Sequence, residues 1–163
     1  MPQRDEVDRI IEAWSRERPD LDFAPLHVLS RVGRLAKHLE RARKAAFAVA
    51  GLEPWEFDVL SALRKAGAPY QLSPTALVQQ TMVSSGTMTN RIDRMVARAL
   101  VERRTDPNDG RGMIVMMTAT GRERVDGAIT SLVHDEKALL SRMPAGEQER
   151  LSSLLRKLSL DGE

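Results

Sequence analysis

The chain has 163 residues, a formal net charge of +2 and no cysteine. Its length suits a single domain with a buried core. The small net charge excludes a polycation that binds nucleic acid by overall charge alone, and the lack of cysteine excludes disulfides, thiolate metal sites and cysteine-based redox sensing. No stretch approaches the roughly 20 apolar residues of a membrane-spanning helix, so we expect no membrane association and a cytoplasmic location.

Two helices are predicted before the first clear break in the chain. Residues 3–17 form a short helix whose apolar side consists of Val7, Ile10, Ile11 and Trp14. Such a short helix is marginal in water, so it must pack against another element. Residues 25–50 form a long helix with one apolar and one basic side. We expect the basic side to be solvated, with contact to a DNA backbone as the alternative.

The next predicted helix, residues 55–65, is apolar nearly all round and is therefore expected to be central. Asp58 is unusual on such a helix, because a carboxylate there is costly unless it is paired or hydrated. A local salt bridge at the helix edge is the simplest interpretation of Asp58.

A short helix, a tight break and a longer helix follow. Ser73 before Pro74 predicts a capped start for a helix that ends at Gln80. After the break at residues 81–83, Ser84 or Ser85 can cap a second helix that runs to about Ala99. A helical wheel places two groups on opposite sides of it: Met88, Ile92, Met95, Val96 and Ala99 on one, and Thr87, Asn90, Arg94 and Ala97 on the other.

A β-hairpin with a polar tip is predicted next. Residues 100–105 and 113–118 are predicted as its two strands, and the segment 106–112, Asp-Pro-Asn-Asp-Gly-Arg-Gly, is a dense turn signal. Taken alone, the tip would be an ordinary solvated loop. After the two preceding helices, the hairpin is typical of the wing in a winged helix-turn-helix, whose second helix enters the DNA major groove. Residues 84–124 also hold eight arginines against five carboxylates, a local excess of positive charge.

Two further helices, at residues 121–143 and 147–160, complete the chain. Together with residues 25–50 they present more apolar surface than the small winged core can cover, which favours a homodimer. The expected fold is therefore mainly α with a small β-hairpin: one domain, residues 1–163, with a winged helix-turn-helix at 54–118 between long N- and C-terminal dimerisation helices at 25–50 and 121–160.

The run from Leu100 to Gly121 resembles the MarR family of bacterial transcription regulators. It contains Leu-Val-Glu-Arg-Arg, then Asp-Pro-x-Asp-x-Arg, an apolar strand, Thr118 and Gly121. Asp109 and Arg111 match the family's wing motif, while Thr120 stands where alanine is common. The resemblance implies a homodimeric DNA-binding regulator whose operators are inverted repeats in double-stranded DNA. The expected DNA-binding residues are Ser84, Ser85, Thr87, Asn90, Arg94, Asp109 and Arg111.

The extra N-terminal helix with its tryptophan resembles the urate-responsive members of that family. Four residues match their effector signature, namely Trp14, Asp58, Arg91 and Arg103. The resemblance implies a small anionic effector, urate-like or a polycarboxylate such as citrate or trans-aconitate, that releases the DNA. Tryptophan supplies a stacking face, and two arginines can hold a carboxylate. In the alternative interpretation Trp14 belongs to the core and Asp58 forms a structural pair with Arg91.

No catalytic pattern is present. The sequence has three scattered histidines and no signature of a metalloprotease, a serine hydrolase or a nucleotide-binding loop. We therefore expect no enzyme activity, no metal and no cofactor. Two alternatives to an effector-responsive repressor stay open: a winged-helix protein–protein adaptor, and a DNA-binding regulator without a small-molecule effector. The polar face of the second helix and the arginine of the wing favour DNA binding.

Overall fold

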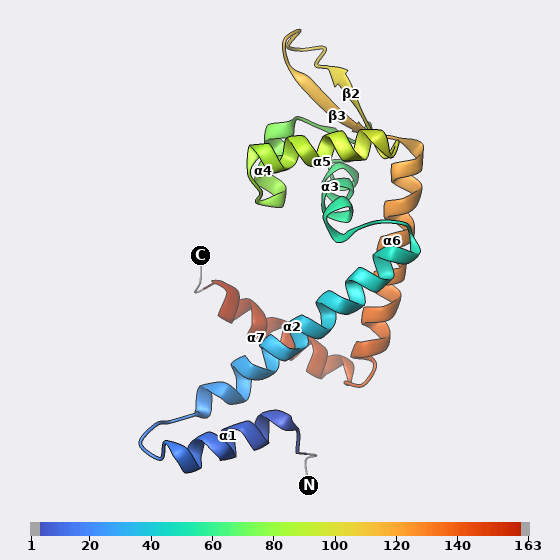
Figure 1. Ribbon diagram of the computed structural model, residues 1–163. Helices are drawn as coiled ribbons and strands as arrows, with labels where there is room; N and C mark the ends of the chain where they lie inside the picture. Colours follow the sequence, from blue (N-terminus) through green and yellow to red (C-terminus); the bar gives the residue numbers. More distant parts are fainter. Residues whose placement is uncertain (1–3, 161–163) are drawn as a thin grey trace. The chain divides into compact units, whose positions relative to one another are not determined.

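The structure, a computed structural model, describes residues 4–160 and divides into two compact units, one ending at Ala45 and the other beginning at Ala46. Figure 1 labels the elements, which start with α1 (Glu6–Glu17) and α2 (Ala24–Val49). The predicted start of the first helix at residue 3 falls outside the described residues. The helix begins at Glu6 because Asp5 caps it, accepting hydrogen bonds from the N–H groups of Val7 and Asp8.

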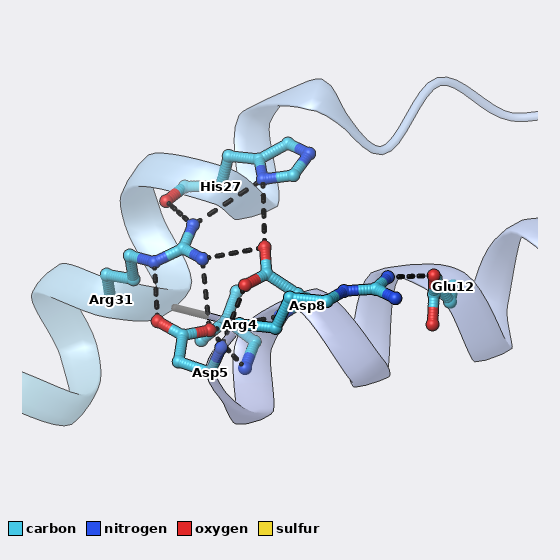
Figure 2. Close-up of polar contacts among 7 residues, drawn as sticks. Arg4, Asp5, Asp8, Glu12, His27 and Arg31 are labelled. Carbon is cyan, nitrogen blue, oxygen red and sulfur yellow. Dashed lines mark hydrogen bonds and ion pairs between the residues drawn. The ribbon is translucent and has the colours of Figure 1, made fainter. Parts of the chain in front are cut away.

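In the first unit, charged groups hold the start of α1 to α2. The Arg31 guanidinium of α2 donates to both carboxylate oxygens of Asp5, at 2.8 and 3.0 Å, and to Asp8 at 2.9 Å (Figure 2). The same guanidinium donates to the carbonyl oxygen of His27 at 2.8 Å. Val7 and Ile11 are buried, as the predicted apolar side requires. Trp14 instead remains 50% exposed and stacks on Phe23, with ring centroids 6.1 Å apart.

The core of the second unit lies among the helices of the predicted winged lobe. These are α3 (Pro54–Lys65), α4 (Pro74–Thr81) and α5 (Ser85–Ala97). The end of α2 is set by Gly51, which has a positive φ of 71° and starts the turn into α3. The fully buried side chains of this core include Leu60, Leu63, Leu77, Met88, Ile92 and Met95. This arrangement confirms α3 as a central helix.

The second helix of the pair ends earlier than predicted. Ala99 adopts a left-handed conformation with φ of 56°, so that α5 stops at Ala97. The N–H of Ala99 donates to the carbonyl of Val96 and the N–H of Leu100 donates to that of Met95, at 2.9 and 3.0 Å, which is the hydrogen-bond pattern of a Schellman C-cap. Val96 and Ala99, placed by the helical wheel on the same side as Met88, Ile92 and Met95, are exposed. The buried side of α5 consists of Met88, Ile92 and Met95 alone.

The sheet has three strands rather than the two predicted. β2 (Val101–Thr105) and β3 (Met113–Met117) form the expected hairpin, which extends away from α4 and α5 in Figure 1. β1 (Gln71–Leu72) adds to the free edge of β3, giving the antiparallel order β1-β3-β2. The sequence of β1 is too short to show the alternation of a strand, and its pairing depends on the edge that β3 provides.

The two last helices are α6 (Ala119–Leu140) and α7 (Ala145–Leu160). α6 starts two residues before the predicted Gly121, since the Thr118 hydroxyl caps it by accepting from the N–H of Gly121 at 3.0 Å. It ends at Leu140 rather than at 143. Several large apolar side chains of these helices are exposed in the single chain, namely Ile129, Val133, Leu140, Leu154, Leu155 and Leu158.

Candidate nucleic-acid interface

The start of α5 is organised by its capping serine. Ser84 has extended backbone angles, and its hydroxyl accepts from the N–H of Thr87 at 3.1 Å and donates to the Thr87 hydroxyl at 2.9 Å. Ser85 is the first helical residue, and its carbonyl accepts from the Thr89 hydroxyl at 3.0 Å. The N-terminal end of α5 is therefore fixed by local hydrogen bonds while its first side chains stay exposed. This is the end that reads base edges in a helix-turn-helix.

One face of α5 is polar and exposed, as predicted. Thr87, Asn90 and Arg94 are all exposed, on the side away from the buried methionines. Arg94 does not extend freely into solvent, because its guanidinium carbon lies 4.7 Å from the centroid of the Trp55 ring. Hydroxyl, amide and guanidinium groups can donate to phosphates and base edges. The face thus has the chemistry required of a DNA-reading helix.

The tip of the β2–β3 hairpin is built by two aspartates. Asp106 accepts from the N–H of Asn108 at 2.8 Å, and Asp109 accepts from the N–H of Arg111 at 3.1 Å. The carbonyl of Asp109 also accepts from the N–H of Gly112 at 2.8 Å. Hydrogen bonds to Asp109 therefore fix the backbone conformation around Arg111. The Arg111 side chain is exposed at the tip, where a cation can reach a phosphate or a narrow minor groove.

The three effector candidates of the second unit have different surroundings. Arg91 lies over Trp55, at 5.6 Å from its ring centroid. Arg103, on β2, forms an ion pair with Asp93 of α5 and so connects the hairpin to that helix. Asp58 is exposed and lines a hollow of about 240 Å³, whereas Arg103 lines a different hollow of about 260 Å³ beside the wing. Trp14, the fourth candidate, belongs to the first unit.

The buried acid of α3 is Glu56, which the sequence analysis did not single out, whereas Asp58 is exposed, in keeping with its interpretation as a helix-edge acid. Glu56 is 1% exposed, pairs with Arg98 and accepts from the N–H of Glu53 at 3.3 Å. A helical wheel starting at residue 56 would have found it, because Glu56 shares a stripe with Val59, Leu60 and Leu63. Arg98 also donates to the carbonyl of Gly51 at 2.7 Å, which ties the C-terminal end of α5 to the turn before α3.

Histidines and carboxylates form no metal centre in the part of the chain that the structure describes. Among residues 4–160, no group of three or more histidine, aspartate or glutamate side chains is arranged to hold a metal ion. His27, near Asp8 at 4.0 Å, belongs to the ion-pair cluster of Figure 2. Within the same range no helix is both long and apolar enough to cross a membrane.

Comparisons with known proteins give the family. The model of the MarR family matches residues 50–112. The HTH-type transcriptional regulator PecS of Dickeya dadantii (strain 3937) is 33% identical over 150 residues, covering 92% of this chain and 90% of PecS. A crystal structure of wild-type MarR from E. coli in its apo form superposes with a TM-score of 0.66 at 26% identity, covering 80% of this chain and 96% of that one.

A second solved structure concerns regulation by a small molecule. It is that of Bordetella bronchiseptica BpsR, described as the mechanism for regulation of its DNA binding by 6-hydroxynicotinic acid. It superposes with a TM-score of 0.59 at 28% identity, covering 79% of this chain and 98% of BpsR. Because the similarity to PecS extends over nearly the whole of both chains, this protein belongs to the MarR family of transcriptional regulators, where it resembles PecS, and it is a DNA-binding regulator rather than an enzyme.

Proposed function

We propose that the protein acts in the cytoplasm as a homodimeric repressor, which binds a pseudo-palindromic operator and is released by a small anionic metabolite. The observation that carries the DNA-binding part is the exposed polar face of α5, with Thr87, Asn90 and Arg94, on the same unit as a wing that ends in Arg111. In this proposal α5 enters the major groove and Arg111 enters the adjacent minor groove. A repressor of this kind blocks transcription while it occupies the operator.

Operator binding can be tested with arginine variants and a control. Arg94→Ala removes a group that reaches base edges, so it should weaken binding and change the sequence preference, at a cost of about 1–3 kcal/mol for a base contact. Arg111→Ala should weaken binding to all sequences and reduce its salt dependence. Arg16→Ala, which changes an exposed arginine outside the winged region and outside the predicted dimerisation helices, is the matched control. If Arg94→Ala and Arg111→Ala bind an inverted repeat as wild type does, the proposed DNA-binding face is incorrect.

Dimerisation is supported by the exposed apolar side chains of α6 and α7. Val133, Leu154 and Leu158 are 57%, 49% and 54% exposed in the single chain, and an exposed apolar surface of this kind favours association. A symmetric dimer would present two copies of α5 to half-sites roughly 34–36 Å apart. Sedimentation should show a stable dimer, and Leu158→Glu should shift it toward monomer. A stable folded monomer of the wild-type chain at micromolar concentration would contradict this part of the proposal.

The effector part of the proposal depends on the arginines. Arg103 joins the wing to α5 through Asp93, so an anion that binds Arg103 competes with Asp93 and loosens the wing from the DNA-reading helix. Arg91 lies on the same helix as Asp93. Trp14, in the first unit, is the aromatic residue of the effector signature, and an indole ring can stack on a planar anion. Two arginines favour an anion over a neutral ligand. The regulation of BpsR by 6-hydroxynicotinic acid, a carboxylic acid and therefore an anion at neutral pH, is consistent with an anionic effector.

Titration of a preformed protein–DNA complex tests the effector. Urate, xanthine, citrate and trans-aconitate are added, and release is followed by fluorescence anisotropy of the labelled DNA. An effector can shift the equilibrium only by its differential affinity for the two states. Trp14→Phe should therefore keep operator affinity and lose the response. Arg103→Ala removes the same pair with Asp93 that the anion would break, so it should weaken operator binding and leave the remaining binding insensitive to the anion. If no anion releases the DNA, the protein is a regulator without such an effector. If wild type binds no DNA, the adaptor alternative gains support.

A further inference from the structure

Trp55 lies beneath the arginines of the DNA-reading helix. It is in the first turn of α3, next to Pro54, and is partly buried against the core of the second unit. The guanidinium carbons of Arg94 and Arg91 lie 4.7 and 5.6 Å from the centroid of its ring. These arginines are three residues apart on α5, which places them on adjacent turns of one face. The indole ring of Trp55 thus makes cation–π contacts with two arginines of α5.

A guanidinium held over an aromatic ring can still bind DNA through its N–H groups. The ring attracts the flat face of the guanidinium through its quadrupole, and the N–H groups at the edge of the guanidinium remain available for hydrogen bonds. A long arginine side chain that is free in solution loses rotamer entropy when it binds. An arginine already held over a ring that the core fixes has less freedom to lose. Stacking should therefore increase the affinity of Arg94 for DNA without any contact between Trp55 and DNA.

We propose that Trp55 is a positioning residue for operator binding, because its indole ring holds the guanidinium of Arg94 in the orientation that contacts DNA. The inference rests on the proposed DNA-binding function. Arg94 has the shorter distance to the ring, and Arg91 shares the ring from the neighbouring turn. Trp55 supports Arg94 from α3, a different element of the core. Without the ring, Arg94 remains charged but samples more conformations.

The first experiment is a double-mutant cycle on operator affinity. The proteins are wild type, Trp55→Leu, Arg94→Ala and the double variant, measured by fluorescence anisotropy with one labelled inverted repeat at one salt concentration. Trp55→Leu should weaken binding roughly 5- to 10-fold, from the magnitude of a partly desolvated cation–π contact. The Arg94→Ala effect should shrink by the same factor in the Trp55→Leu background. Trp55→Phe, which keeps a weaker aromatic face, should recover part of the loss.

The second experiment changes the ring without changing its packing. Progressive fluorination of tryptophan weakens the negative potential on the ring face and leaves the shape of the side chain nearly the same. In a Trp14→Phe background, Trp55 is the one tryptophan that remains. Operator affinity should fall stepwise with fluorination. The trend should persist with Arg91→Ala and vanish with Arg94→Ala. This series also covers the case in which Trp55→Leu does not fold.

The possible outcomes separate the inference from the function on which it rests. If Arg94→Ala leaves operator affinity unchanged, the proposed DNA-binding face is wrong, and the inference about Trp55 falls with it. If Arg94→Ala weakens binding but its effect is additive with that of Trp55→Leu within twofold, and fluorination has no effect, only the positioning role is wrong. Coupling between the two residues together with a fluorination trend supports the inference.

Discussion

Substitution of Gly121 by alanine should destabilise the second unit, because the start of α6 lies against the chain between α5 and β2. A Cβ atom at Gly121 would lie 2.2 Å from the carbonyl oxygen of Leu100 and 3.1 Å from side-chain atoms of Leu60 and Met117. The first of these is a backbone atom and cannot rotate away. Relief therefore requires the whole start of α6 to move.

Such a movement also affects the hydrogen bonds at this junction. The Thr118 hydroxyl donates to the carbonyl of Ala99 at 2.7 Å, and the N–H of Thr118 donates to the carbonyl of Leu100 at 3.2 Å. Overpacking in a close-packed interior costs about 1–3 kcal/mol, and the loss of a helix cap costs about 1 kcal/mol. The higher helix propensity of alanine returns at most about 1 kcal/mol. We expect Gly121→Ala to lower the free energy of unfolding by about 1–3 kcal/mol.

The matched control is Gly127→Ala in the same helix. A Cβ at Gly127 has nothing within 4 Å, so alanine there should be neutral or stabilise by up to about 1 kcal/mol. The free energy of unfolding is measured by urea denaturation, with all proteins at one concentration because dimerisation makes stability depend on concentration. If the stability of Gly121→Ala matched that of Gly127→Ala, the close approach between α6 and Leu100 would not exist in solution.

Three further predictions concern other parts of the chain. Arg98→Ala leaves the buried Glu56 without its guanidinium and should cost about 3 kcal/mol in urea unfolding, the lower end for breaking a buried pair because Arg98 is partly exposed; Glu56→Gln, which removes the charge instead, should cost less. Ala99→Gly relieves the positive φ of 56° at the end of α5 and should raise the melting temperature, a gain of up to about 1 kcal/mol. Hydrogen bonds from Arg31 lower the pKa of Asp5 to about 2 from its ordinary 3.8, and a hydrogen bond from the Asp5 N–H, followed by Arg31, lowers the pKa of Asp8. A carboxyl group whose pKa is lowered in the folded protein stabilises the fold at pH values above its ordinary pKa. The contribution of Asp5 to the packing of α1 should therefore be lost as the pH falls from about 4 to about 2. An NMR titration should show a higher Asp5 pKa in Arg31→Gln than in wild type, and an unchanged low value there would contradict the assignment.

Elements stabilised by residues close to one another in the sequence could be predicted from the sequence alone. Ser73 and Ser84 each cap a helix within three residues of themselves, and the aspartates at 106 and 109 fold the wing tip through their own neighbours. The polar face of α5 follows from helical periodicity alone. For the same reason the family resemblance could be recognised from the wing, where Asp109 and Arg111 stand in a fixed local relation. These features do not depend on how distant segments pack.

Features that depend on contacts between distant segments could not be predicted from the sequence. β1 exists because β3 offers it an edge, and the partner of the buried Glu56 is Arg98, 42 residues away in the sequence. Arg103 of β2 forms an ion pair with Asp93 of α5. Arg94, which periodicity could place only on the exposed face, is held by a tryptophan from another helix. Each of these pairings joins side chains from separate elements, and periodicity within one element carries no information about which partner the fold brings to it.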